Sequence, residues 1–148
     1  MTDESPGGAR AGANHRAILW TDGASRGNPG PAGIGALLKT LAGEVLAAES
    51  AYLGEATNNV AEYKALLMGL ERALELGVKQ LEVRADSELL IKQLKGQYQV
   101  RNAGLQPLYR SALSLLARFE ASTLLHVRRE HNLEADRLAN AGIDSRPR

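Results

Sequence analysis

The chain has 148 residues, 44% of them hydrophobic and 24% charged, with a formal net charge of +1 at pH 7. This length suits one domain with a substantial core, and the absence of cysteine excludes disulfides and thiolate metal sites. No apolar run in the sequence reaches the roughly 18 residues that a membrane span needs, and a nearly neutral protein does not hold nucleic acid by bulk charge alone. We therefore expect a cytoplasmic protein without a membrane partner, and a monomer by default.

The first part of the sequence predicts a tail followed by three strands. Residues 1–15 are rich in Gly, Ala and polar residues, and we expect them to be disordered. Strands are predicted at 17–23 (AILWTDG), 34–40 (IGALLKT) and 44–54 (EVLAAESAYLG). Because their connections are short and contain glycine, the three strands are typical of an antiparallel meander.

The second part of the sequence alternates helices and strands. Apolar residues recur about every 3.6 positions from Val60 to Leu74, which predicts a helix that ends near Gly77. The remaining predicted elements are a strand at 81–85, a helix at 87–94, a loop at 95–104, a helix at 105–119, a strand at 123–129 and a helix at 133–143. This order predicts the α/β class, with one domain over 16–144 and a short tail at 145–148.

Four acidic residues lie at junctions of these elements, and each has a structural explanation when taken alone. Asp22 suits a turn before glycine, and Glu62 stands three residues after Asn59, the spacing of a capping box. Asp86 suits the cap of the next helix, and Asp136 suits the first turn of the last helix, where the helix dipole favours an anion.

Taken together, the same acids predict a metal site. If the first and fourth strands are neighbours, Asp22 and Asp86 lie at the same end of the sheet, and the helical periodicity turns Glu62 toward it. Two carboxylates about 4 Å apart repel each other by about 4 kcal/mol at an effective dielectric of about 20. Such a cluster needs cations or protons, and oxygen ligands without cysteine favour Mg²⁺ or Mn²⁺ over Zn²⁺.

Four segments occur in the order found in ribonuclease HI (type 1 ribonuclease H) and resemble its motifs: TDGASRGNPGPAGIGALL, TNNVAEYKALLMGL, VRADSELLIKQL and REHNLEADRLAN. The resemblance extends from about Ile18 to Ile143. It implies a ribonuclease H-like fold, which is a five-stranded mixed sheet with three antiparallel strands first and helices on both faces. It also implies an endoribonuclease that cuts the RNA strand of RNA–DNA hybrids with two divalent ions, leaving 5′-phosphate and 3′-hydroxyl ends.

The resemblance assigns roles to individual residues. The implied catalytic metal ligands are Asp22, Glu62, Asp86 and Asp136. The implied contacts to the RNA strand are Asn28, Asn58, Asn59 and Glu88, and the implied contacts to a phosphate of the DNA strand are Thr57 and Asn102. Without the family, helix capping explains the two adjacent asparagines and a turn before proline explains the first one.

The segment at 95–104 departs from the best-known members, which carry a longer basic helix and loop there. We therefore expect weaker and more salt-sensitive binding of the hybrid. Lys92, Lys95, Arg101 and Arg110 are candidates to substitute in part for the missing segment. The alternative is that these four residues form an ordinary charged surface.

A second departure concerns an auxiliary residue near the metal site. The VRREHN segment resembles a subgroup with a shorter loop, in which an arginine lies close to the metal ions. Arg129 is the first candidate for this role and His131 the second, whereas His126 lies inside a predicted strand and is expected to be structural. Two other functions remain open: a nuclease of the same fold that cuts double-stranded RNA, and a module that binds hybrids without cutting them.

Overall fold

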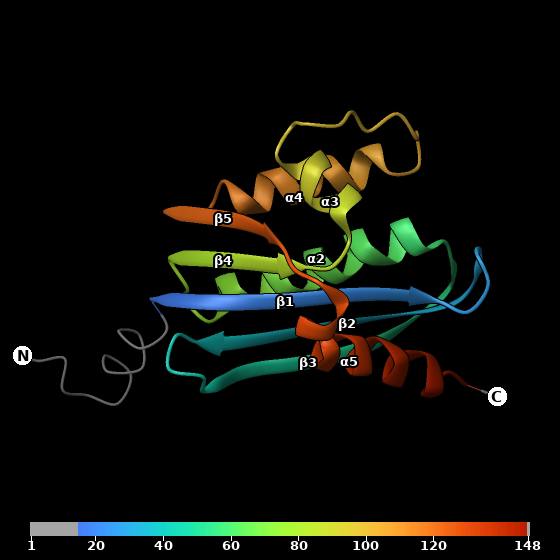
Figure 1. The fold of residues 1–148 in the computed structure, drawn as a ribbon, viewed down its shortest axis with the longest axis horizontal. Helices are drawn as coiled ribbons and strands as arrows, with labels where there is room; N and C mark the ends of the chain where they lie inside the picture. Colours follow the sequence, from blue (N-terminus) through green and yellow to red (C-terminus); the bar gives the residue numbers. More distant parts are fainter. Residues whose placement is uncertain (1–14, 148) are drawn as a thin grey trace, which may run out of the picture.

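The computed structural model describes residues 15–147, which form one mixed sheet with helices on both of its faces (Figure 1). Its elements are β1 (Arg16–Ser25), β2 (Gly30–Thr40), β3 (Val45–Ala56), α2 (Asn58–Glu75), β4 (Gln80–Ala85), α3 (Glu88–Leu94), α4 (Gln106–Leu116), β5 (Ala121–His126), the short 3₁₀ helix η2 (Arg129–His131) and α5 (Leu133–Asp144). The predicted order of strands and helices is therefore confirmed. Apart from His15, the predicted N-terminal tail lies outside the described residues. None of the helices within 15–147 combines the length and apolarity of a membrane-crossing segment.

The sheet has the strand order β3-β2-β1-β4-β5. The first three strands are antiparallel, whereas β4 runs parallel to both β1 and β5. The first and fourth strands are thus neighbours, as the argument for a metal site required. In the register of this pair Thr21 lies opposite Ala85, so the next residue of each chain segment, Asp22 and Asp86, leaves the pair at the same level.

Two helices cover opposite faces of the sheet, and glycines let them approach closely. On one face, a Cβ at Gly35 of β2 would lie 2.5 Å from the carbonyl oxygen of Ala135 in α5. On the other face, Gly69 of α2 packs against the side chain of Leu19 in β1. Figure 1 shows α5 over β2 and β3, and α2 on the other side of the sheet.

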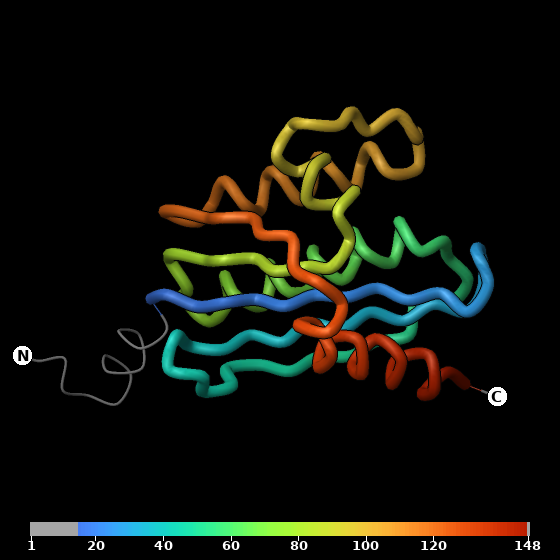
Figure 2. Tube along the Cα trace, in the orientation of Figure 1, coloured from blue at the N-terminus to red at the C-terminus, as the bar shows by residue number. Residues whose placement is uncertain are grey.

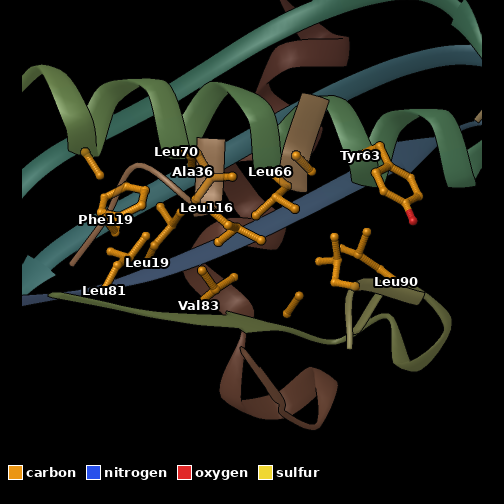
Figure 3. Packing of buried hydrophobic residues seen from close by; sticks show 14 of the residues in the cluster. Leu19, Ala36, Tyr63, Leu66, Leu70, Leu81, Val83, Leu90, Leu116 and Phe119 are labelled. Carbon is orange, nitrogen blue, oxygen red and sulfur yellow. The ribbon is translucent and has the colours of Figure 1, made fainter. Parts of the chain in front are cut away.

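The main core lies between the sheet and the layer of α2, α3 and α4 (Figure 3). Two linked hydrogen bonds lie at the edge of this core. The Tyr63 hydroxyl donates to Oε1 of Gln93 at 2.7 Å, and Nε2 of Gln93 donates to the Gln99 carbonyl at 3.4 Å. Burial raises the pKa of Tyr63 above its usual range. These hydrogen bonds connect α2 and α3 to the 95–104 loop, which projects beyond the sheet on the side of β5 (Figure 2).

Some element boundaries differ from those predicted. β1 continues past Gly23 to Ser25, because the glycine is a packing position inside the strand and not its end. β5 ends at His126, three residues earlier than predicted, because its neighbour β4 ends at Ala85, whose carbonyl accepts a hydrogen bond from the Val127 N–H at 2.9 Å. Of the predicted C-terminal tail, residues 145–147 follow the end of α5 at Asp144, and residue 148 lies outside the described part of the chain.

Candidate active site

Asp22 lies inside β1 and is only 5% exposed. It pairs with Gly35 of β2, so the explanation as a turn residue is wrong. α5 packs against Gly35 through the backbone of Ala135. The same pairing therefore brings the next residue of α5, Asp136, to the level of Asp22.

Glu62 reaches the site because α2 packs directly on β1. A Cβ at Gly23 would clash with the backbone of Ala61 and Glu62, so only glycine permits this approach. The carboxyl group of Glu62 is buried next to the backbone of Gly23. The capping-box explanation is wrong, because the N-cap of α2 is Thr57, whose Oγ1 accepts a hydrogen bond from the Val60 N–H at 3.2 Å.

Asp86 follows the last residue of β4 and is half-buried. It does not cap α3, since the N-cap is Ser87, whose Oγ accepts from the Leu90 N–H at 3.2 Å. Instead, Oδ2 of Asp86 accepts a hydrogen bond from Nδ2 of Asn132 at 3.3 Å. Asn132 was not predicted as a site residue, and the available signal was its place next to the last helix, four residues before Asp136.

The side chains of Asp22, Glu62 and Asp86 converge: one carboxylate oxygen of each lies within 4.8 Å of the others. Asp136 stands outside this group of three, yet its carboxyl group is within hydrogen-bonding reach of Asp22. Nδ2 of Asn140 holds Asp136 from the next turn, through the backbone carbonyl at 3.0 Å and Oδ1 at 3.4 Å. The structure thus brings the four predicted acids together around Asp22 of β1.

Burial and mutual repulsion perturb this cluster. Burial, the Asp86 carboxylate and the neighbouring Asp136 raise the pKa of Asp22 to about 8. Burial, followed by the charges of Asp22 and Asp86, raises the pKa of Glu62 well above its ordinary value. Oε1 of Glu62 is also buried without a hydrogen-bond partner among the described residues. A set of crowded oxygen donors with one lone buried oxygen fits a hard divalent cation.

The residues expected to contact RNA lie partly together. The Asn58 backbone N–H donates to Oδ1 of Asn28 at 3.0 Å, and Oδ1 of Asn58 accepts from the Ser25 N–H at 3.0 Å. Asn59 is exposed beside them. Helix capping does not explain the two adjacent asparagines, because Thr57 is the cap.

The other expected contacts lie on separate elements. Glu88 is exposed and pairs with Nζ of Lys92 at 3.1 Å. Asn102 lies in the 95–104 loop, where its Oδ1 accepts from the Gly104 N–H at 2.7 Å.

The auxiliary candidates, Arg129 and His131, are both exposed on η2, the short helix that leads into α5. No hydrogen bond or ion pair within residues 15–147 involves the side chain of either residue. His126 lies at the end of β5, as predicted for a strand residue, and it is exposed opposite Ala85.

Known proteins with sequences similar to this chain include ribonucleases HI. Residues 20–142 match the family described as reverse transcriptase-like. The chain is 42% identical over 129 residues to ribonuclease HI of Halobacterium salinarum, and the matched region covers 87% of this chain and 65% of that protein. It is also 42% identical over 131 residues to the bifunctional protein Rv2228c of Mycobacterium tuberculosis. The chain spans 36% of the length of that mycobacterial relative.

Comparison with solved structures agrees. RNase H1 from Halobacterium salinarum NRC-1 superposes with a TM-score of 0.86 at 41% identity, over 88% of this chain and 99% of that one. LC11-RNase H1, solved in complex with an RNA/DNA hybrid, superposes with a TM-score of 0.83 at 41% identity, over 86% of this chain and 96% of that one.

Proposed function

The chain belongs to the ribonuclease HI family, and from this premise we propose that it hydrolyses the RNA strand of RNA–DNA hybrids. The observation that carries the proposal is the convergence of Asp22, Glu62 and Asp86 within 4.8 Å of one another, with Asp136 beside them. A relative at 41% identity was solved in complex with an RNA/DNA hybrid. The expected products carry 5′-phosphate and 3′-hydroxyl ends.

Two divalent ions, Mg²⁺ or Mn²⁺, are the cofactors that we propose for this site. Asp22, Glu62, Asp86 and Asp136 would hold them, since all four offer oxygen donors; burial and the neighbouring carboxylates raise the pKa values of Asp22 and Glu62, which supports a role for a compensating cation. When bound, a pair of such ions supplies an activated water and stabilises the leaving oxygen. The chain itself supplies carboxylates from β1, α2 and α5 and from the turn between β4 and α3, and sites built on strands and helices hold their ligands more precisely than sites built on loops.

Recognition of RNA is proposed for the amides at the end of β1 and the start of α2. Asn28 and Asn58 use their side-chain oxygens internally. No hydrogen bond among the described residues uses the NH₂ group of either side chain, and both residues are exposed. An NH₂ donor suits a 2′-hydroxyl, the group that distinguishes RNA from DNA. We propose that Asn59 and Glu88 add to this surface.

The remaining proposed roles concern phosphates. Thr57 and Asn102 are proposed to face a phosphate of the DNA strand, and Arg129, with His131 as the second candidate, is proposed to assist release of the product. Arg129 and His131 of η2 are exposed close to the first turn of α5, where Asp136 lies. The cytoplasmic location and the monomeric state expected from the sequence stay predictions.

The test is cleavage of a labelled RNA–DNA hybrid by the purified chain in Mg²⁺ or Mn²⁺. We expect Asp86→Asn to lower the rate by several orders of magnitude, because the carboxylate is lost at nearly constant size. The matched control is Glu120→Gln, an exposed acid beyond the opposite end of β4, which should cleave like the wild type. A wild type without activity, or an Asp86→Asn variant with full activity, would contradict the proposal.

Two parallel assays separate the alternatives. Double-stranded RNA of the same sequence is incubated under the same conditions, and equal cleavage of both substrates would replace hybrid specificity by a broader activity. Binding of the hybrid is also measured in EDTA. Tight binding in EDTA without turnover under any metal would instead indicate a binding module.

A further inference from the structure

Asn132 connects the three segments that carry Asp22, Asp86 and Asp136. It lies between η2 and α5, and it is only 2% exposed. Its Nδ2 donates to the carbonyl of Thr21 at 2.9 Å and to Oδ2 of Asp86 at 3.3 Å. Its own backbone carbonyl accepts from the Asp136 N–H at 3.0 Å. A single residue therefore contacts β1 next to Asp22, the carboxylate of Asp86, and the first turn of the helix that carries Asp136.

Helix capping does not explain this arrangement. Asn132 occupies the N-cap position of α5, where an asparagine side chain ordinarily accepts a hydrogen bond from the first turn. Here the side chain makes no such bond and turns toward the sheet instead. Its Oδ1 is buried without a hydrogen-bond partner among the described residues. An unsatisfied buried carbonyl destabilises a fold, so stability alone does not account for the residue.

The chemistry of the two partners fixes the orientation of the amide. Both the Thr21 carbonyl and the Asp86 carboxylate are acceptors, so the NH₂ end of Asn132 must face them. A neutral donor is well suited to this place. A lysine or arginine would compete with divalent ions for the carboxylates, and an aspartate would repel Asp86.

We propose that Asn132 is a positioning residue of the active site: its amide holds the Asp86 carboxylate in a fixed orientation relative to Asp22 and Asp136. The part of this inference that concerns hydrolysis rests on the proposed function, whereas the part that concerns metal binding does not. Outer groups that orient metal ligands typically contribute about 10- to 100-fold to metal affinity or activity. Because Asn132 is buried, it does not reach the nucleic acid, and its effect passes through Asp86.

Two substitutions test the proposal. Asn132→Ala removes the donor, and Asn132→Asp keeps the size of the side chain but places an oxygen where the NH₂ group stood. The first measurement follows the melting temperature of the nucleic-acid-free protein during a Mg²⁺ titration, and the second determines kcat and KM for the hybrid. For both variants we expect the Mg²⁺ midpoint to rise and kcat to fall by about tenfold or more, with KM for the hybrid changed less than about twofold.

Leu81→Ala is the control for general destabilisation. Leu81 is buried near the start of β4, at the opposite end of the sheet from the carboxylates. We expect this variant to melt at a lower temperature while it keeps the wild-type Mg²⁺ midpoint and kcat. The proposal is overturned if Asn132→Asp behaves like the wild type, which would indicate a packing role. It is also overturned if Leu81→Ala shifts the midpoint and kcat as much as the Asn132 variants do.

The two readouts keep this inference separate from the proposed function. If the wild type binds Mg²⁺ but never cleaves a hybrid, the proposed function is wrong, and the Mg²⁺ midpoints still decide the role of Asn132. If the wild type cleaves hybrids and the Asn132 variants match it in both midpoint and kcat, only the positioning role is wrong.

Discussion

Burial of the carboxylates, together with their mutual repulsion, makes the metal-free protein sensitive to pH. The pKa of Asp22 is about 8 in the folded protein, against an ordinary value of 3.8. Between these two values the folded chain keeps a proton that the unfolded chain has released. The contribution of Asp22 to stability is therefore full below about pH 4 and is lost as the pH rises toward about 8. Divalent ions held by these carboxylates would replace the proton as the compensating charge, so Mg²⁺ should flatten this dependence.

At the residue scale we predict that Asp136→Asn raises the melting temperature in EDTA at about pH 8 while it lowers cleavage by several orders of magnitude. One charge that repels Asp22 is removed at constant size. Thermal unfolding in EDTA and in Mg²⁺ checks this. Asp144→Asn is the control on the same helix. The hydrogen bond from Arg26 lowers the pKa of Asp144, so its charge is favourable and removing it should not raise the melting temperature. A lower melting temperature for Asp136→Asn would count against a repulsive cluster.

At the scale of elements, the site depends on how closely two helices approach the sheet. Gly23 places the backbone of α2 directly on β1, and Gly35 does the same for α5 on β2. These two contacts set the positions of Glu62 and Asp136 relative to Asp22. The glycines thus act on the site although neither one carries a functional group.

For this reason we predict that Gly23→Ala lowers both stability and activity. The added methyl group meets the backbone of Ala61 and Glu62, which cannot move aside as a flexible side chain would. We expect a loss of about 1–3 kcal/mol in the free energy of unfolding, measured in urea, and a fall in kcat of at least tenfold as Glu62 shifts. Gly104→Ala should unfold like the wild type, since its Cβ meets only a side-chain oxygen of Asn102. Unchanged stability of Gly23→Ala would contradict the close contact.

The sequence predicted those features that local patterns encode. The apolar periodicity located α2, and the acids at element junctions indicated a common site once β1 and β4 were assumed to be neighbours. Gly23 was misread as the end of a strand, because nothing in the local pattern shows that a helix lies on it. Asn132 was missed for a similar reason: its hydrogen-bond partners Thr21 and Asp86 are 111 and 46 residues away in the chain. Contacts of this kind are set by tertiary packing alone.

At the scale of the whole molecule, a net charge of +1 leaves binding to a few local cations. Lys95 and Arg101 are exposed on or beside the loop that projects past β5 (Figure 2). Lys92 is already engaged by Glu88 and lies 5.0 Å from the ring of Tyr98. Lys95 and Arg101 are therefore better candidates than Lys92 for contacts with phosphate.

We predict that the double variant Lys95→Ala/Arg101→Ala binds the hybrid more weakly, with a shallower dependence on salt. Each lost phosphate contact lowers the slope of log K against log salt by about 0.9. Fluorescence anisotropy with a labelled hybrid in EDTA, at several salt concentrations, measures this slope. Arg118→Ala, an exposed residue beyond the end of α4, removes a charge at the other end of this helix from the loop and should keep the wild-type slope. Equal slopes for all three proteins would leave the loop as an ordinary charged surface.

The late place of α5 in the chain has a consequence for synthesis. All five strands and the helices α2, α3 and α4 precede residues 133–144, so they leave the ribosome first. A growing polypeptide in which the sheet has already formed still lacks Asp136 and the amide that steadies Asp86. Such a polypeptide would therefore lack the complete set of acids proposed to hold the ions, and the site would be completed only when α5 packs on β2.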